Sequence, residues 1–215
     1  MHEPYEYLAA RDAVLSELIE LHGMPDPFAW ADVGGVAVDE PTSALLLHIC
    51  GQQISTSVAL AVHRRLLTLV DDRPTPEALV ALTPDQLVSV GLSRAKVRSV
   101  RDLARQLVEG RLALTGLQDS TDDRVMQALC AVRGIGPWTA QMYLLHQLRR
   151  PDVLPAADIG LRRACAHAYR LPSLPDARDV VRLAAPWQPY RSYAVALLWA
   201  DLRQRRSTGG AMPDG

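Results

Sequence analysis

The sequence predicts an all-α protein, and three observations support this prediction. Apolar residues recur three and four positions apart over much of the chain, the spacing that places them on one face of a helix. Strand-like alternation is scarce, and hairpin dipeptides between β-branched runs are absent from the sequence. Two periodic runs begin with a capping hydroxyl and a proline, at Thr75-Pro76 and Thr83-Pro84.

Each predicted element follows from one periodic run. The runs cover residues 43–70 with a joint at CGQQIS, then 97–110, 123–132, 139–148, 160–169 and 193–202. Prolines break the segments 149–158 and 185–192, so both are predicted to be connectors. The last residues, 207–215, are rich in glycine and are predicted to be a disordered tail.

Length and composition set the broad class. A chain of 215 residues, 48% hydrophobic and 22% charged, can bury one substantial core or two small lobes. It has no run approaching the ~18–20 uncharged apolar residues of a membrane span, and its acidic start does not resemble a secretion signal. Cys50, Cys130 and Cys165 form no CxxC pair and are predicted to be buried, reduced thiols. We therefore expect a cytoplasmic protein.

Charge is distributed unevenly along the chain. The net charge is −1, yet residues 1–40 hold nine acids and one base, so the remainder carries +7. Lys96 is the only lysine, and the other basic residues are arginines. A segregated basic surface is the footprint of a DNA-binding protein, although arginine enrichment can also reflect genome composition.

The stretch AVRGIGPWTAQMYLL, residues 131–145, places two glycines and a proline between two helical runs. Gly134 and Gly136 permit positive φ and close approach, and Pro137 suits the first position of a helix. Such a turn can present backbone N–H groups to a phosphate. The alternative is a glycine-capped joint in an ordinary helical bundle.

Five segments in order resemble the helix-hairpin-helix DNA glycosylase superfamily over roughly residues 41–200. They are CGQQIS, GLSRAKVRSVRDLA, RGIGPWTAQ, DVLPAADIGLRRA and WQPYRSYAVALLW. The alkylpurine branch, represented by bacterial 3-methyladenine DNA glycosylase II, is most similar, but its extra N-terminal β domain is not matched. The resemblance implies two helical lobes with a DNA-binding cleft: residues 41–150 carrying the hairpin 133–137, and residues 1–40 with 151–206.

The resemblance assigns the chemistry to Asp158, which lies 20 positions after Trp138. A carboxylate near the sugar would stabilise the developing oxocarbenium ion and assist the attacking water. The alternative role, a helix N-cap, is compatible with catalysis. Bifunctional members carry a lysine where this chain has Trp138, so we expect a monofunctional hydrolase without strand-cleaving lyase activity.

The resemblance also places residues around the flipped base and on the DNA. An electron-rich pocket would attract a cationic alkylpurine. Trp138 and Trp199 match aromatic pocket positions, Tyr193 and Trp187 are secondary candidates, and Met142 and Ile159 replace tyrosines of the relative. Gln53 matches the residue that fills the gap left by base flipping, with Gln52 as a second minor-groove contact. The expected DNA-binding residues are Gln52, Gln53, Gly91, Arg94, Lys96, Arg98, Gly134, Ile135, Gly136 and Thr139.

No cofactor is expected to be required. By resemblance, main-chain carbonyls of Cys130, Val132 and Ile135 would hold a Na⁺ or K⁺ ion at the hairpin. The expected partner is double-stranded DNA with damaged bases, bound by a monomer. Two alternatives remain: excision of deaminated or etheno-adducted purines, and a non-catalytic damage-binding protein.

Overall fold

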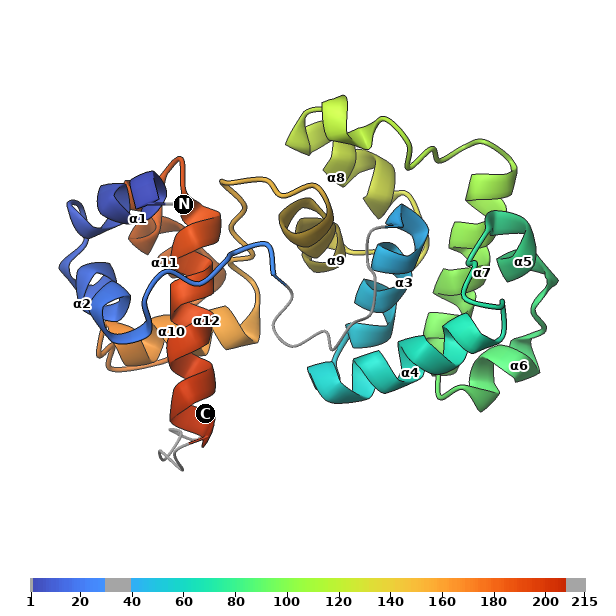
Figure 1. The fold of residues 1–215 in the computed structure, drawn as a ribbon, viewed down its shortest axis with the longest axis horizontal. Coiled ribbons are helices and arrows are strands. Elements are labelled where there is room, and N and C mark those ends of the chain that lie inside the picture. Colours follow the sequence, from blue (N-terminus) through green and yellow to red (C-terminus); the bar gives the residue numbers. More distant parts are fainter. Residues whose placement is uncertain (1, 30–39, 208–215) are drawn as a thin grey trace. The chain divides into compact units, whose positions relative to one another are not determined.

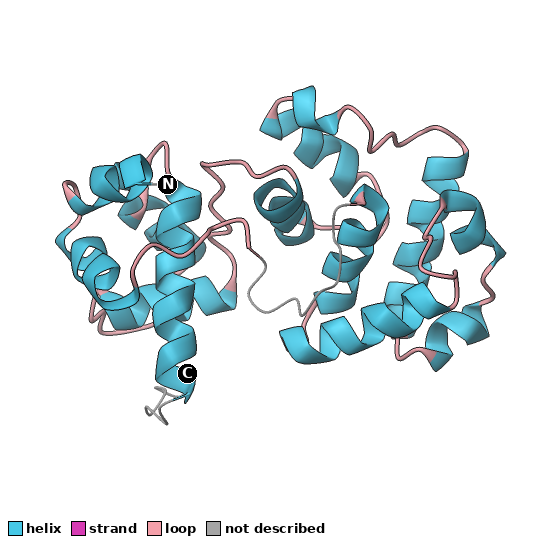
Figure 2. Cartoon of the chain, viewed as in Figure 1, coloured by secondary structure: helices cyan, strands magenta, loops and turns pink. Residues whose placement is uncertain are grey.

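The computed structural model describes residues 2–29 and 40–207, and Figures 1 and 2 show that these fold into helices joined by turns. The chain divides into two compact units. One comprises Met1–Trp30 with Arg149–Gly215, and the other comprises Ala31–Leu148. The described residues include no β-strand, which confirms the predicted all-α class. The predicted tail lies outside the described residues beyond Ser207, which ends the last helix.

The first unit surrounds the long C-terminal helix. Its elements are α1 (His2–Ala9), α2 (Ala13–His22), α10 (Ile159–Ala168), α11 (Ala177–Leu183), a 3₁₀ turn (Ala185–Trp187) and α12 (Arg191–Ser207). Helix α12 packs against α10, α2 and α1. The core between these helices contains the fully buried side chains of Tyr5, Leu161 and Trp187.

The second unit is formed by the middle of the chain. Its elements are α3 (Pro41–Gly51), α4 (Thr56–Thr68), α5 (Pro76–Ala81), α6 (Pro84–Ser89), α7 (Arg94–Val108), a 3₁₀ turn (Leu117–Asp119), α8 (Asp122–Cys130), α9 (Pro137–Met142) and a π-helical turn (Tyr143–Gln147). Helix α3 packs against α4, α7 and α9. It is apolar nearly all round and buried from Thr42 to Cys50, as expected of a central helix.

Helix α7 has two different faces. Val97, Val100 and Leu103 are buried, and they recur at the three-residue spacing of one helical stripe. The opposite face carries arginines that are exposed to solvent. Helices α5 and α6 both pack against α7.

The predicted helix starts are present. Thr75 accepts a hydrogen bond from the Ala78 amide, and Thr83 forms a reciprocal capping box with Gln86. Both are followed by proline in the first turn. Ser55 caps α4, so the long periodic run 43–70 divides into α3 and α4 at the predicted joint.

The cysteine prediction was partly wrong. Cys50 and Cys165 are buried free thiols, and burial raises the pKa of each to about 12. Cys130 is also free but exposed, because it is the last residue of α8, on the helix face away from the buried Val125 and Leu129. In the described part of the chain, no helix is long and apolar enough to cross a bilayer.

Candidate functional site

The turn between α8 and α9 is held at the surface of the second unit. Gly134 has a φ of +79°, the left-handed conformation that glycine adopts readily. Gly136 does not use the positive φ that glycine permits: its φ is −97°, which any residue can adopt. Gly136 is the N-cap of α9 and supplies no capping side chain. Pro137 occupies the first turn, as predicted.

Gly134 is also required by close packing. A Cβ atom at this position would lie 2.0 Å from Ser99 Oγ and 3.1 Å from Ser99 Cβ. Ser99 is buried on α7 and donates its hydroxyl to the carbonyl of Ala95. The turn therefore rests directly on α7 at a point where no side chain fits.

Two polar side chains of α7 fasten the same turn. Asp102 accepts the backbone N–H of Arg133 at 2.9 Å, and the Gln106 amide donates to the carbonyl of Ala131 at 3.3 Å. The Arg133 N–H, followed by Gln106 and Arg105, holds the pKa of Asp102 below its ordinary value. The carboxylate is thus stabilised in its charged form by the turn that it holds.

The C-terminus of α3 is tied to both of these elements. The Gln52 amide donates to the Gly134 carbonyl at 2.9 Å and to Thr139 Oγ1 at 3.0 Å. Lys96 Nζ donates to the Cys50 carbonyl at 2.8 Å and so joins the start of α7 to the end of α3. Three segments that are distant in sequence, 50–54, 91–106 and 131–139, therefore form one interlocked surface of the second unit.

These contacts change the roles predicted for three side chains. Gln52 was expected to contact the minor groove, but both of its amide donor bonds are made inside the protein. Thr139 is 2% exposed, so its side chain is a partner of Gln52 and not a DNA contact. Lys96 was expected to contact DNA, but it is half-buried on α7 and its ammonium group donates to the Cys50 carbonyl near the end of α3. In each case packing decides the role.

Of the other predicted DNA contacts, Gln53, Arg94 and Arg98 lie at the surface, whereas the Ile135 side chain is buried. Gln53 is exposed with a φ of +59° and follows Gln52, the C-cap of α3. Gly91 has a φ of +104° and a Cβ there would meet Val62 at 3.2 Å, so the turn between α6 and α7 also requires glycine. Arg94 and Arg98 are exposed on α7. Ile135 is 3% exposed, so only its backbone could serve a ligand.

Asp158 is the N-cap of α10 in the first unit. Its Oδ1 accepts the backbone N–H of Leu161 at 2.7 Å, as the alternative reading predicted. A Cβ atom at Gly160 would lie 3.0 Å from this oxygen and 3.7 Å from Trp199 Nε1. The carboxylate of Asp158 and the indole edge of Trp199 therefore flank the same small residue, and both side chains are half-buried.

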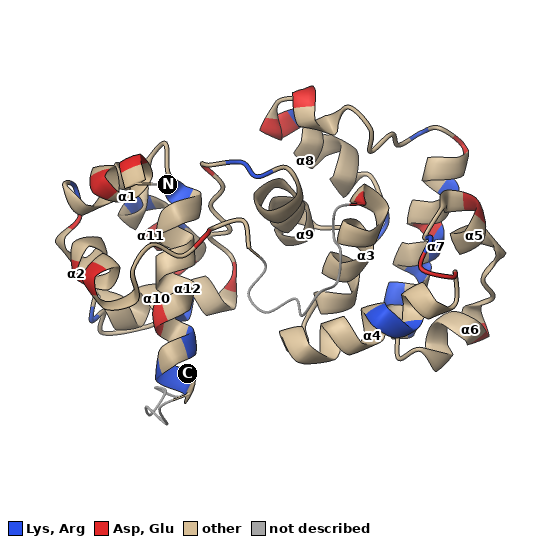
Figure 3. Cartoon of the chain, in the orientation of Figure 1, with Lys and Arg blue, Asp and Glu red and all other residues tan. Residues whose placement is uncertain are grey.

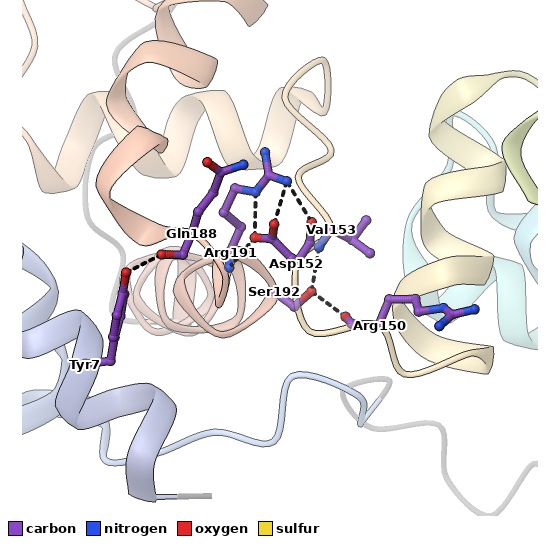
Figure 4. Close-up of polar contacts among 7 residues, drawn as sticks. All are labelled: Tyr7, Arg150, Asp152, Val153, Gln188, Arg191 and Ser192. Atoms are coloured by element: carbon purple, nitrogen blue, oxygen red, sulfur yellow. Dashed lines mark hydrogen bonds and ion pairs between the residues drawn. The ribbon is translucent and has the colours of Figure 1, made fainter. Parts of the chain in front are cut away.

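The segment leading to Asp158 is fixed to the start of α12 (Figure 4). Arg191 binds both carboxylate oxygens of Asp152, at 2.7 and 2.8 Å, and donates to the Asp152 carbonyl at 3.0 Å. Ser192 Oγ donates to the Arg150 carbonyl at 2.7 Å and accepts the Val153 N–H at 3.0 Å. Because α12 also carries Trp199, this clamp sets the position of the segment relative to that indole.

The other predicted pocket residues have different environments. Trp187 is fully buried and donates its indole N–H to Asp12 at 2.8 Å, so it belongs to the core of the first unit, which corrects its assignment to the base pocket. Tyr193 is half-buried among Tyr5 and Phe28, and Ile159 is 48% exposed. In the second unit Trp138 is half-buried, whereas Met142 is 3% exposed in the core.

Sequence reasoning missed the residues that hold the site in place. Ser99, Asp102 and Gln106 support the turn, and Asp152 with Arg191 clamps the segment that leads to Asp158. A signal was present for the first group, because residues 99, 102 and 106 share one stripe of the predicted helix 97–110. The partners of Asp152 lie 39 positions away, and no local pattern indicates them.

Comparison with known proteins places these features in a family. The model for the HhH-GPD superfamily of base excision DNA repair proteins matches residues 47–189. The chain belongs to this superfamily. The match contains the interlocked surface of the second unit and the Asp158 segment of the first.

Individual relatives and structures agree with this membership. The chain is 32% identical over 161 residues to a Bacillus subtilis protein, YfjP, named provisionally as a DNA-3-methyladenine glycosylase. That alignment covers 72% of this chain and 56% of the relative, so the chain spans little more than half of that protein's length. It is 27% identical to Schizosaccharomyces pombe DNA-3-methyladenine glycosylase 1, covering 74% of this chain and 72% of the relative.

Two solved structures have the same fold. A Bacillus halodurans DNA-3-methyladenine glycosidase superimposes with a TM-score of 0.77 at 28% identity, covering 95% of this chain and 91% of that one. The Schizosaccharomyces pombe 3-methyladenine DNA glycosylase, solved in complex with abasic DNA, gives a TM-score of 0.82 at 24% identity. It covers 92% of this chain and 95% of that one.

Proposed function

We propose that this chain is a monofunctional DNA N-glycosylase that removes alkylated purines, of the 3-methyladenine and 7-methylguanine type, from duplex DNA. The observation that carries the proposal is the position of Asp158, a half-buried carboxylate at the start of α10 and beside the indole of Trp199. Membership of a base excision repair superfamily, and relatives named as 3-methyladenine glycosylases, support the same reaction.

The chemistry follows from the leaving group. An N3- or N7-alkylated purine is already cationic, so the N-glycosidic bond breaks with its electron pair passing to a base that leaves neutral. The sugar is left as an oxocarbenium ion, which the charge of Asp158 stabilises. Water then adds to the sugar carbon and gives up a proton, for which Asp158 is the acceptor. The products are a free base and an abasic site.

The base must leave the helix to reach this carboxylate. The indole of Trp199 offers an electron-rich surface for the cationic base, and Trp138 and Tyr193 are further candidates. Gln53, exposed at the end of α3, would occupy the space left in the duplex. We expect no Schiff-base chemistry, because Trp138 stands at the position where bifunctional relatives carry lysine.

The interlocked surface of the second unit would bind the DNA backbone. Its turn exposes Gly134 and leaves the first turn of α9 without a capping side chain, which suits a phosphate. A Na⁺ or K⁺ ion would fit here through the carbonyls of Cys130, Val132 and Ile135. The Val132 oxygen accepts the Ile135 N–H at 3.1 Å and keeps a second lone pair. The ion would supply positive charge toward a phosphate.

We further propose that the protein acts as a monomer. We also propose that it acts in the cytoplasm, where the reducing environment keeps thiols such as its three free cysteines unpaired. The test of function is incubation of the purified chain with randomly methylated duplex DNA, followed by chromatography of the released bases. Release of 3-methyladenine or 7-methylguanine is the expected result. Release of only deaminated or etheno purines from matched substrates would support the second reading. Tight binding to damaged DNA with no release would support the non-catalytic reading.

A further inference from the structure

A basic groove lies on the second unit beside the turn that was described above. It has a volume of about 730 Å³ and is formed by α5, α6, α7 and Arg133 of the turn. Its lining includes five arginines and two aspartates, a net charge of +3, together with Val80, Val88 and Val97. We call this feature the arginine groove; its basic residues are Arg94, Arg98, Arg101, Arg105 and Arg133.

Most of the positive charge in the arginine groove is not neutralised internally. Within the described part of the chain, Arg105 is the one groove arginine that forms an ion pair, with Asp102 at 2.5 Å. Asp102 also accepts the Arg133 backbone N–H and a Gln106 amide hydrogen, so its oxygens are already engaged. Guanidinium groups of like charge that share one depression repel one another, and an anion bound there would relieve this repulsion.

The arrangement of the arginines suits an extended polyanion. Positions 94, 98, 101 and 105 follow the four- and three-residue spacing of one helix face, and Figure 3 shows basic residues along α7. At 1.5 Å per residue the row extends for about 16 Å along the helix. A DNA strand carries one phosphate per about 3.4 Å of duplex axis, so several phosphates pass within that length.

We propose that the arginine groove binds the phosphate backbone of duplex DNA outside the flipped nucleotide, as a site separate from the turn amides. The choice of DNA rests on the proposed function and on continuity. Arg133 is adjacent to Gly134 in the turn between α8 and α9, and Arg94 begins α7 three residues after Gly91 in the turn between α6 and α7. Both ends of the groove therefore meet segments that the proposed function already places against the backbone.

The test is the salt dependence of binding to an undamaged duplex of about 30 base pairs, which involves no chemistry. The lead variant is Arg101→Gln combined with Arg133→Gln, since both side chains are exposed and neither forms an ion pair. Each lost phosphate contact should lower the slope of log K against log salt by about 1, so the double variant should lose about 2. Arg101→Gln alone should lose about 1, and Arg101→Lys with Arg133→Lys should restore the wild-type slope.

The matched control removes two exposed arginines outside the groove, with Arg73→Gln and Arg178→Gln. Its slope should equal that of the wild type. A folded double groove variant, judged by an unchanged melting temperature, whose slope equals that of the control would overturn the proposal. Failure of the wild-type chain itself to bind duplex DNA would instead overturn the proposed function, and the groove assignment with it.

Discussion

The carboxylate of Asp102 accepts the backbone N–H of Arg133 at 2.9 Å across 31 positions of sequence. This bond connects α7 to the glycine turn, and it is supported by Gln106 from the next turn of the same helix. The turn is thereby held in one conformation before any ligand arrives. A preorganised turn loses less conformational freedom on binding, which favours affinity.

Replacing Asp102 with alanine should therefore destabilise the protein in a pH-dependent way. Loss of a hydrogen bond to a charged group costs about 1–3 kcal/mol, which we expect as a lower free energy of unfolding at pH 7. The pKa of Asp102 is lowered in the folded state, so its contribution is present above the unfolded-state value of about 3.9 and is lost as the pH falls further.

Thermal melts of the wild type and the Asp102→Ala variant between pH 3 and pH 7 measure this contribution. The gap between their melting temperatures should narrow as the pH falls below about 3.9 toward pH 3, because the unfolded carboxyl then binds a proton more readily than the folded one. Asp123, exposed on α8, provides a control: Asp123→Ala should shift the melting temperature little at any pH. A gap at Asp102 that stays constant over the whole range would mean that its charge does not hold the turn.

Replacing Asp158 with asparagine should abolish most base release while keeping the fold. An asparagine oxygen can still accept the Leu161 N–H, so the cap of α10 survives and the negative charge is lost. Electrostatic stabilisation of this kind is worth about 3–4 kcal/mol, or roughly a hundred- to a thousandfold in rate. Single-turnover release of methylated bases measures the effect.

The same variant should bind a duplex with an abasic analogue as the wild type does, and should keep its melting temperature. Asp176→Asn is the matched control, because Asp176 is also an N-cap, at the start of α11. Excision by Asp158→Asn at near the wild-type rate would remove the catalytic assignment and leave Asp158 as a cap alone.

Borohydride added during turnover should trap no covalent complex between the protein and DNA. Trapping requires an amine that attacks the sugar, and by the family resemblance Trp138 occupies the position of the lysine in bifunctional members. Lys96 Nζ donates one hydrogen bond to the Cys50 carbonyl, at 2.8 Å, near the end of α3. Denaturing gels of the reaction provide the measurement. A strong shifted band would show that an amine participates in the chemistry.

The helical class and the position of the glycine turn were predictable because both follow from local patterns. Helix-period spacing, threonine-proline starts and the order Gly-x-Gly-Pro are each confined to a few neighbouring residues. Asp158 was identified as the candidate catalytic residue because it lies 20 positions after Trp138, as the resemblance to the DNA glycosylases requires. Its role as a cap was also predictable, because it directly precedes a periodic run.

The internal roles of Gln52, Thr139 and Lys96 could not be predicted in the same way. Each side chain is polar and is compatible with DNA binding by type, and only the packing of α3 against α7 and α9 turns it inward. The assignment of Trp187 to the base pocket was wrong for a related reason, since its hydrogen-bond partner Asp12 is 175 positions away. Burial of a polar group is decided by distant segments, so local spacing carries no information about it.

Alanine at Gly134 should be strongly destabilising for two separate reasons. A φ of +79° is unfavourable for a residue with a side chain, at about 1–3 kcal/mol, and the new Cβ would lie 2.0 Å from Ser99 Oγ. Chemical denaturation should show a lower free energy of unfolding. Adding Ser99→Gly should restore the part of the free energy of unfolding that the clash removes. The part due to the strained backbone at position 134 should remain lost. No recovery in the double variant would mean that Ser99 is not the obstacle.

Glutamate at Gly136 should separate the role of the turn in binding from its role in folding. The φ of −97° accepts any residue, and a Cβ atom there meets nothing within 4 Å, so the variant should fold with little change in melting temperature. Its carboxylate would project where a phosphate approaches the start of α9. Affinity should then fall for damaged and undamaged duplexes alike, because phosphate contacts carry no sequence information, and the salt dependence should become shallower. Gly136→Gln, which has the same length without the charge, should weaken binding less. A folded Gly136→Glu protein that binds duplex DNA as tightly as the wild type would mean that the turn is structural.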